Sequence, residues 1–346
     1  MKKADNIMLL TEKMRSPTSH DVARLAGVSQ STVSRVFSGG KGVSEASKEK
    51  ILDAAKKLHY RPNAFARGLT QQRSGLIGIV FPETFSPVYH DLLLQLSDEL
   101  MRQGYSSLLI PYQLSDVEDY SLVKLFHYRV EGIIVMSSTL DSQLVKECLN
   151  LNIPLVQVGR TEKGINSDSV VSDNEGGGRL AAESLYYSGA QRIAYLSGDK
   201  NTSTNKEREK GFCQRIQELT GALPDIYEAK FSYQSGVDAT QRLLVSSNRP
   251  DALFCANDMI ALGAIDAAKR YFDLALPEQL QIIGFDDISQ AGWLNYQLST
   301  IKQDVDAIVE SAVSLLIKRI DDVEYQTSTI IVPVKLVQRN TSKSAT

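Results

Sequence analysis

The stretch DVARLAGVSQSTVSRVF, residues Asp21–Phe37, decides how the first part of this 346-residue sequence is expected to fold. Apolar residues recur at helical spacing on both sides of Gly27, and a glycine that adopts a positive φ readily ends a helix. Thr18 is placed to cap the first segment, with Asp21 in its first turn, and Ser29 is placed to cap the second. Two short helices joined by a tight glycine turn form a helix–turn–helix unit.

The second of these helices has an apolar and a polar face. Val33, Val36 and Phe37 fall on the apolar face. The polar residues at positions i, i+1, i+4 and i+5 fall on the other, where they can contact a binding partner: Gln30, Ser31, Ser34 and Arg35. A third helix is expected after Ser44, with Ile51, Leu52, Ala55 and Leu58 buried. Three short helices can close one small core.

Charge is distributed unevenly along the chain. Met1–Arg73 contains 14 Lys and Arg against 6 Asp and Glu, a net charge of +8, whereas the remainder contains 24 against 35, a net charge of −11. A basic head on an acidic body indicates a polyanionic partner for the head. Charge alone leaves open the alternative of a lysine-rich head that is merely well solvated.

The segment YRPNAFARGLT, residues Tyr60–Thr70, follows the third helix. Pro62 suits a helix start. Isolated helices shorter than ~12–15 residues are marginal in water, and an internal glycine such as Gly68 costs about 1 kcal/mol relative to alanine. We therefore expect this segment to be helical only where something braces it.

Residues Thr18–Leu69 resemble the DNA-binding head of the LacI/GalR (lactose-repressor) family of bacterial transcription regulators. The shared order is DVA, AGVS, TVSRV, YRPN and ARGL. The resemblance implies that Gln30, Ser31 and Arg35 read base edges in the major groove, where arginine pairs with guanine and glutamine with adenine. It implies that Thr32 and Ser34 contact phosphates, which position a protein without specifying sequence.

The same resemblance assigns Leu69 as an apolar wedge in the minor groove, able to kink the duplex. It also assigns Asn63, Ala66 and Arg67 to the hinge helix beside the DNA backbone. Two alternatives stay open: Gln30 and Arg35 could be solvated surface residues, and Leu69 could pack on the body.

From Ser74 onward, nearly unbroken apolar runs alternate with amphipathic helical stretches, which indicates parallel strands covered on both faces. The runs form two series: 75–81, 105–112, 130–138, 153–159 and 170–172, then 192–198, 226–231, 252–258 and 280–287. The expected fold is an all-α helix–turn–helix head followed by an α/β core of two doubly wound parallel-sheet subdomains. Ligands in such sheets bind beyond the carboxyl ends of the strands.

The body also resembles the LacI/GalR core, which is similar to type I periplasmic sugar-binding proteins. The phrases that carry this are VEGIIVMSS, VVSDNEGGGRLAAESLYYSGAQRIAYLSG, PDALFCANDMIALGAIDAAKR, LQIIGFDDI and LSTIKQ. The implied organisation is a tail (1–16), a DNA-binding head (17–60), a hinge (61–73) and a core (74–346), with one subdomain at about 74–172 and 304–326 and the other at about 173–303 and 327–341. The helix Val305–Asp321 would return to the first subdomain and the segment TIIVPVKLVQRN to the second.

The family's effector cleft maps onto several residues of this sequence. Arg208 matches an arginine that bonds vicinal hydroxyls or an acid, and Asp286 matches an acceptor for hydroxyl groups. Asn257 offers a donor and an acceptor, and Phe231 an aromatic face. The further candidates are Phe254, Arg160 and, from the first subdomain, Tyr89.

Several other features favour a regulator over an enzyme or a receptor. The purine-binding branch has an arginine where this chain has Thr202, so a sugar is expected rather than a purine. Asp258 and Asp287 fit helix-start or loop acids, Gly176–Gly178 fits close helix packing better than a phosphate site, and Trp293 fits either the rim or the core. No catalytic set, nucleotide fingerprint or metal-ligand spacing is found, so we expect no enzymatic activity, no metal and no cofactor.

The sequence contains few indications of the cellular compartment. Cys148, Cys213 and Cys255 are far apart, which fits a reducing cytoplasm. The apolar run Ile7–Leu10 is too short for a signal peptide core, and no run reaches the ~20 residues of a membrane helix.

Together these features predict a cytoplasmic, homodimeric repressor of a carbohydrate-utilisation operon. It would bind a palindromic operator, with its affinity set by a sugar or sugar-phosphate effector. Whether the effector releases DNA or is needed to hold it stays open, as does a protein co-regulator. The rival functions are a solute-binding receptor of the same clamp fold and a sugar-acting enzyme.

Overall fold

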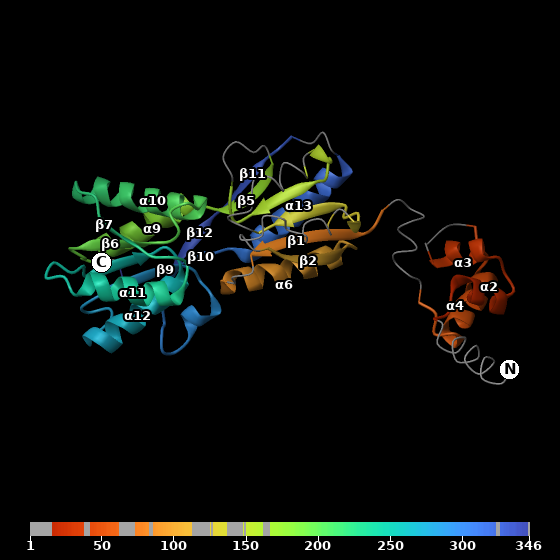
Figure 1. The fold of residues 1–346 in the computed structure, drawn as a ribbon, viewed down its shortest axis with the longest axis horizontal. Helices are drawn as coiled ribbons and strands as arrows, with labels where there is room; N and C mark the ends of the chain where they lie inside the picture. Colours follow the sequence, from red (N-terminus) through yellow and green to blue (C-terminus); the bar gives the residue numbers. More distant parts are fainter. Residues whose placement is uncertain are drawn as a thin grey trace, which may run out of the picture. The chain divides into compact units, whose positions relative to one another are not determined.

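The computed structural model describes residues 16–37, 42–61, 73–82, 86–112, 125, 127–136, 148, 150–161, 167–322 and 326–344. The chain divides into two compact units, Met1–Ser74 and Gly75–Thr346, each of which is described by itself (Figure 1). The hinge residues Asn63, Ala66, Arg67 and Leu69 lie outside the described residues, as do residues 1–15 of the predicted tail.

The described part of the first unit contains three helices, α2 (Ser19–Ala26), α3 (Gln30–Phe37) and α4 (Glu45–Lys57). The backbone N–H and the hydroxyl of Thr18 both donate to the Asp21 carboxylate, at 2.9 and 2.8 Å, which fixes the start of α2. Gly27 ends α2 with φ 66° and ψ 36°, a left-handed conformation that glycine adopts without steric cost. The helix–turn–helix geometry expected from the sequence is therefore confirmed.

The core of this unit is smaller than the sequence pattern predicted. Val22, Val33 and Ile51 are fully buried at its centre. Leu52, which was expected in the core, is 47% exposed, and the apolar Leu25 of α2 is 52% exposed. Helices of this length bury only a narrow stripe, so apolar residues at its margin remain in contact with solvent.

The second unit contains two six-stranded sheets. The first has the order β11-β5-β4-β3-β1-β2, and every strand pair in it is parallel. Its strands are β1 (Leu76–Pro82), β2 (Ser106–Tyr112), β3 (Gly132–Val135), β4 (Leu155–Val158), β5 (Asp168–Ser172) and β11 (Thr329–Val332). The central strands β3, β4 and β5 are buried along their whole length, as expected for a sheet covered on both faces.

The second sheet has the order β12-β10-β9-β8-β6-β7, and all its pairs are parallel except β10 with β12. Its strands are β6 (Ile193–Ser197), β7 (Asp225–Glu228), β8 (Ala252–Cys255), β9 (Gln281–Asp286), β10 (Ser299–Gln303) and β12 (Val334–Val337). The two doubly wound sheets predicted from the apolar runs are thus both present.

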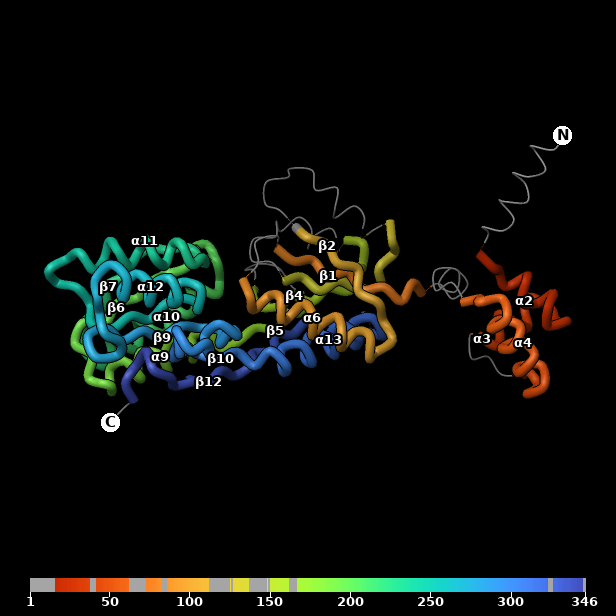
Figure 2. The backbone as a smooth tube through the Cα atoms, turned by 90° about the horizontal axis from the view of Figure 1, so that it is seen from below, coloured from red at the N-terminus to blue at the C-terminus, as the bar shows by residue number. Residues whose placement is uncertain are grey.

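The described helices of this unit pack against the sheets. They are α6 (Pro87–Arg102), α9 (Asn174–Tyr187), α10 (Ser203–Thr220), α11 (Tyr233–Leu244), α12 (Asp258–Phe272), α13 (Val305–Asp321) and the short 3-10 helix η1 (Ser289–Gly292). Figure 1 shows α9 and α10 on one face of the second sheet and α11 and α12 on the other. Figure 2 shows α13 beside α6 at the first sheet, where the resemblance placed the helix Val305–Asp321.

The chain passes between the two sheets three times, and the third passage corrects a predicted boundary. The first two passages follow Ser172 and Gln303. The third was expected before residue 327, but β11 pairs with β5 of the first sheet, and only β12, after Pro333, pairs with β10 of the second. The run TIIVPVKLV reads as one apolar segment, and Pro333 divides it because proline has no N–H to donate to a ladder.

Helix α9 packs against α10 through glycine, which agrees with the close-packing interpretation of Gly176–Gly178. A Cβ on Gly178 would lie 2.3 Å from the backbone oxygen of Arg208 and 2.8 Å from the backbone nitrogen of Phe212. Backbone atoms cannot move aside as a flexible side chain can, so Gly178 permits this contact and fixes the position of Arg208.

The substitution Gly178→Ala is expected to destabilise the second unit by about 1–3 kcal/mol, since it overpacks a helix–helix contact. It should lower the Tm of that unit, measured by differential scanning calorimetry of the full chain. Gly292→Ala is the matched control, because a Cβ on Gly292 meets no atom within 4 Å and the residue has no positive φ. Equal Tm values for the two variants would refute the packing role of Gly178.

Candidate DNA-reading face and effector site

The polar face predicted for the second helix of the head is exposed on α3. Val33 is fully buried beneath it, whereas Gln30, Ser31, Ser34 and Arg35 are exposed and Thr32 is half-buried. Val33 anchors this helix in the core, and an N-terminal cap fixes where the helix begins. We call the five polar residues Gln30, Ser31, Thr32, Ser34 and Arg35 the α3 polar face.

A network of hydroxyl groups fixes the start of α3. The Ser29 hydroxyl accepts from the Thr32 backbone N–H at 3.2 Å and lies 2.8 and 2.7 Å from the hydroxyls of Ser31 and Thr32. Gln30 donates from Nε2 to Ser19 Oγ at 3.3 Å, which joins the starts of α2 and α3. These contacts order the first turn of α3, and the four exposed side chains of the face can turn donors and acceptors outward.

Arg208 is the centre of a buried polar cluster in the second unit. Its Nε donates to Asn174 Oδ1 at 2.9 Å, and its Nη1 donates to the backbone oxygen of Ala256 at 2.6 Å. Its Nη2 lies 3.5 Å from Asp286 Oδ1, and its guanidinium stacks 3.5 Å from the centroid of the Phe285 ring. Burial lowers the pKa of Arg208, and the Asp286 carboxylate opposes that effect.

Asp286 ends β9 in an unusual backbone conformation. Its φ is 125°, and that of the next residue, Asp287, is 58°. Positive φ at two consecutive non-glycine residues is strained and is typical of functional sites. Gln303 Nε2 donates to Asp286 Oδ1 at 2.7 Å. Burial raises the pKa of Asp286 to about 6, although the Arg208 charge acts in the opposite direction.

The contacts place this cluster at the carboxyl ends of neighbouring parallel strands. Asp286 closes β9, Gln303 closes β10, and Ala256 follows β8. Parallel α/β sheets bind ligands in this position, because the strands end there and the helices begin. We call these groups, with Arg208 and Asn174, the Arg208–Asp286 cluster.

Two predicted residues from the first half of the chain lie near the cluster. The Tyr89 phenol, on α6, and the Arg160 guanidinium, after β4, both act electrostatically on Arg208. Arg160 Cζ lies 5.8 Å from the centroid of the Phe231 ring. The structure therefore brings Tyr89 and Arg160 near Arg208, and Arg160 near Phe231.

Two other residues predicted for the effector site make structural contacts: one caps a helix, and one packs in the core. Asn257 caps α12 by accepting from the Ile260 N–H at 3.0 Å, and it is buried. Phe254 is fully buried and packs against Tyr195 and Phe212, with ring centroids 5.4 and 4.9 Å away. Phe254 is therefore a core residue, and the structure does not support its assignment to the ligand site, because alternate residues of a strand point to opposite faces.

The two acids interpreted as structural have structural partners. Asp258, the first residue of α12, accepts from Thr300 Oγ1 at 2.6 Å and from the Ile288 N–H at 2.9 Å. Asp287 pairs with Arg339 at 2.6 Å. Trp293 is 56% exposed, which excludes a place in the core.

Comparison with known protein families finds a match in each of the two units. Residues 18–63 match the family described as bacterial regulatory proteins, lacI family, and residues 182–342 match the periplasmic binding protein-like domain. The chain is 31% identical to the HTH-type transcriptional repressor PurR of Aliivibrio salmonicida over 89% of its own length and 94% of the relative's. It is 32% identical to the ribose operon repressor of Haemophilus influenzae, over 94% and 97% of the two chains. The chain belongs to the LacI family.

A solved structure of the same family agrees with the whole fold. The Lac repressor dimer bound to operator and the anti-inducer ONPF has a TM-score of 0.86 and 28% identity, covering 94% of this chain and 99% of that one. This LacI-family chain is therefore a DNA-binding transcription regulator with a helix–turn–helix head and a periplasmic-binding-protein-like core.

Sequence reasoning missed three groups of the LacI-family cluster. Asn174 and Gln303 bond Arg208 and Asp286, and the Phe285 ring stacks on Arg208. Asn174 and Gln303 do have a signal, because each is a polar residue at a junction between an apolar strand and a helix. Phe285 has no such signal, because in the sequence it is one of several apolar residues in β9.

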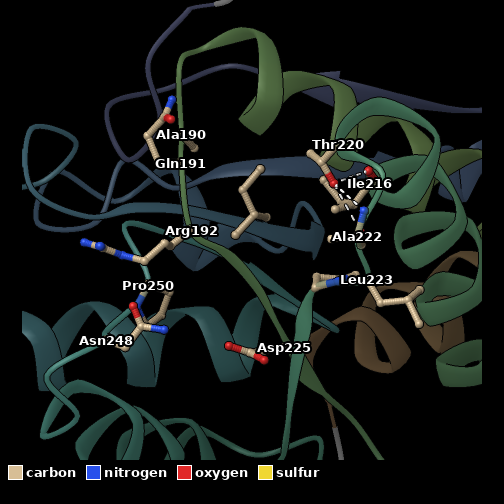
Figure 3. Close-up of a pocket in the computed structure, with 12 residues that line it drawn as sticks. Ala190, Gln191, Arg192, Ile216, Thr220, Ala222, Leu223, Asp225, Asn248 and Pro250 are labelled. Atoms are coloured by element: carbon tan, nitrogen blue, oxygen red, sulfur yellow. Dashed lines mark hydrogen bonds between the residues drawn. The ribbon is translucent and has the colours of Figure 1, made fainter.

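The core also has a pocket of about 230 Å³ at the amino ends of β6, β7 and β8, opposite the Arg208–Asp286 cluster (Figure 3). It is lined by Ala190, Gln191, Arg192, Ile193, Ile216, Thr220, Ala222, Leu223, Pro224, Asp225, Asn248 and Pro250. None of the predicted effector residues is among them. Ligands of doubly wound sheets bind at the other end of the strands, so this pocket does not change the assignment.

Within the ranges described, no group of three or more His, Cys, Asp or Glu side chains is placed to share a metal ion. In the described part of the chain, no helix is both long and apolar enough to span a bilayer. Cys148, Cys213 and Cys255 are free and buried.

Proposed function

We propose that this LacI-family chain is a homodimeric repressor of a carbohydrate-utilisation operon, controlled by a sugar or sugar-like ligand at the Arg208–Asp286 cluster. One observation carries the proposal: a single chain combines an exposed α3 polar face with a buried cluster of donors and acceptors at the carboxyl ends of a parallel sheet. The first suits a duplex, and the second suits a small hydroxylated molecule.

The α3 polar face would read the operator from the major groove. Arg35 and Gln30 can each form two hydrogen bonds with one base, and Ser31 can add another. Thr32 and Ser34 would contact phosphates. Two heads of a dimer would read two half-sites, so a palindromic operator is expected. The Lac repressor relative, which was solved as a dimer on its operator, supports this arrangement.

The hinge assignments extend this proposal. Asn63, Ala66 and Arg67 would lie near the DNA backbone, and Leu69 would wedge into the central minor groove. Their segment is too short to be a stable helix by itself, so its folding would depend on contact with DNA and with the partner's hinge. A ligand that prevents that contact would then weaken operator binding.

The cluster suits a sugar better than a purine. Asp286 can accept from hydroxyl groups, Arg208 can donate to them, and the Phe231 ring offers a flat apolar face. The relatives include both a ribose operon repressor and a repressor named PurR. Thr202, where the purine-binding branch has an arginine, is occupied as the N-cap of α10 and donates to the Asp199 carbonyl at 2.7 Å.

A chain of buried hydrogen bonds connects the ligand site to the passages between the sheets. Gln303 donates to Asp286, and its Oε1 accepts from Ser172 Oγ at 2.6 Å. Ser172 and Gln303 are the last residues of β5 and β10, where the chain leaves one sheet for the other. A ligand that binds Asp286 would therefore change the contacts at the ends of β5 and β10, where the chain passes between the sheets.

The substitution Gln303→Met is expected to uncouple ligand from operator. Methionine keeps the length of the side chain but neither donates to Asp286 nor accepts from Ser172. Allosteric coupling is typically worth ~1–3 kcal/mol, so the ratio of operator affinities with and without ligand should fall about 5- to 150-fold. The ratio is measured by fluorescence anisotropy of a labelled operator. Lys302→Met, at the exposed neighbouring position of β10, is the control; an unchanged ratio in Gln303→Met would exclude the relay.

The proposed function is tested by gel shift of the purified chain on its own promoter fragment, with and without a set of sugars. Sequence-specific binding that a sugar changes would support it. Turnover of a sugar with no promoter preference would instead support the enzyme alternative, and sugar binding with no promoter preference would support the receptor alternative.

A further inference from the structure

Arg160 reaches the region of the Arg208–Asp286 cluster with most of its hydrogen-bonding capacity unused. Its Nε and Nη1 atoms are buried, and neither has a hydrogen-bond partner among the residues that the structure describes. A buried polar group without a partner is unfavourable, and a buried charge more so, unless a ligand completes its contacts. Arg208 differs in this respect, because it is bonded to Asn174, Ala256 and Asp286.

The carboxylate that interacts electrostatically with Arg160 is already engaged elsewhere. Asp286 acts electrostatically on both guanidinium groups, but it lies 3.5 Å from Arg208 and accepts from Gln303. Two guanidinium groups therefore share Asp286, and the positive charge of Arg160 has no ion pair within the described part of this site.

The position of Arg160 adds to this positive potential. The next residue, Thr161, donates its backbone N–H to Ser203 Oγ at 3.3 Å, and Ser203 is the first residue of the 18-residue helix α10. The N-terminus of a helix carries partial positive charge and unpaired N–H groups. The Phe231 ring, 5.8 Å from Arg160 Cζ, gives the guanidinium an aromatic neighbour but no hydrogen-bond acceptor.

We infer that the ligand of this chain carries an anionic group, a phosphate or a carboxylate on a sugar, and that Arg160 binds this group. The inference rests on the proposed function and specifies its ligand. The planar guanidinium offers parallel N–H groups whose spacing matches two oxygens of a phosphate or carboxylate. The sugar hydroxyls would face Asp286 and Arg208, and the anionic group would face Arg160 and the start of α10.

Inorganic phosphate provides a test that needs no knowledge of the sugar. The Tm of the full chain is measured in increasing potassium phosphate against potassium chloride of equal ionic strength. We expect a saturable rise in phosphate for the wild type and for Arg179→Gln, which removes a guanidinium exposed on α9. The rise should be absent in Arg160→Gln, which should also have a higher Tm than the wild type without phosphate, because a buried unpaired charge is removed. Equal responses of wild type and Arg160→Gln to phosphate would overturn the inference.

The second experiment is a calorimetric titration of the full chain with matched neutral and anionic sugars. Glucose, fructose, ribose and galactose are each compared with their phosphate esters and with the corresponding sugar acids. We expect an anionic member to bind about 100-fold more tightly than its neutral parent, with this preference lost in Arg160→Gln. The phosphate and acid arms distinguish the two anions, and if no sugar binds, the inorganic phosphate experiment decides.

Operator binding separates failure of this inference from failure of the proposed function. A neutral sugar that changes operator affinity equally in wild type and Arg160→Gln would overturn the inference while supporting the proposed function. Absence of any promoter preference would overturn the proposed function itself.

Discussion

Replacing Arg35 with alanine is expected to weaken specific operator binding about 5- to 150-fold for each half-site, since a bidentate base contact contributes ~1–3 kcal/mol of discrimination. In a dimer both half-sites lose the contact, so the two losses add to about 2–6 kcal/mol of specific binding free energy. Affinity for random duplex should change much less, because a single arginine neutralises only one phosphate and releases only its counterion. The measurement is fluorescence anisotropy on promoter and random duplexes at several salt concentrations.

The conservative variant Arg35→Lys is the matched control. Lysine keeps the charge but not the planar fork, so non-specific affinity and its salt dependence should be retained while discrimination falls. Arg35 is exposed on α3, so both variants should stay folded, which the Tm of the head checks. Equal losses on promoter and random duplex in Arg35→Ala would contradict base reading and indicate a phosphate contact instead.

Replacing Asp286 with alanine is expected to abolish the response to ligand. It removes the acceptor for the ligand hydroxyls and leaves Arg208, 3.5 Å away, as a buried charge without its ion pair. Breaking a buried pair in this way costs about 3–5 kcal/mol, so the Tm of the second unit should fall as well. Asp286→Asn separates the two effects, since the amide keeps an oxygen for Gln303 and the volume of the side chain.

The neighbouring acid provides a control for Asp286. Asp287→Ala breaks the 2.6 Å pair with Arg339, so it should lower the Tm without removing the ligand response. The readouts are calorimetric unfolding and the change in operator affinity on adding ligand. A retained ligand response in Asp286→Ala, at a temperature where the variant is folded, would exclude Asp286 from the site.

Ligand affinity should depend on pH near the raised pKa of Asp286, about 6. The carboxylate accepts hydrogen bonds in its ionised form, so affinity should fall about tenfold per pH unit once the pH drops below 6. The contribution of Asp286 to folding stability changes in the opposite direction. The folded state holds this proton more tightly than the unfolded state, so that contribution is present at low pH and is lost as the pH rises through about 6. Titrations between pH 5 and 7 should show the dependence in wild type and not in Asp286→Asn.

The sequence predicted most of the fold because its signals were periodic and local. The helix Val305–Asp321 has the predicted bounds, and each of the nine apolar runs overlaps a strand. Two errors have physical causes. Strand pairing is a long-range property, so TIIVPVKLV did not reveal that β11 and β12 belong to different sheets. The amphipathic pattern of a short helix also overstates its core, as exposed Leu25 and Leu52 show.

The site was predictable where the resemblance to the LacI family supplied a residue match. Asp286 and Arg208 were assigned in this way, and they lie 3.5 Å apart in the structure. The sequence could not show that Phe254 packs among core aromatic residues, because the face of a fully buried strand cannot be read from an unbroken apolar run. Gln303 and Ser172 could not be recognised as partners, because their contact joins strands 131 residues apart.

The most direct test of the central claim is a titration of the full chain on its own promoter fragment and on random duplex, with and without an anionic sugar. At equal salt, the promoter should bind at least about 10³-fold more tightly than random duplex, and the sugar should change this ratio. Equal affinity for the two duplexes at every salt concentration, with or without the sugar, would contradict the account.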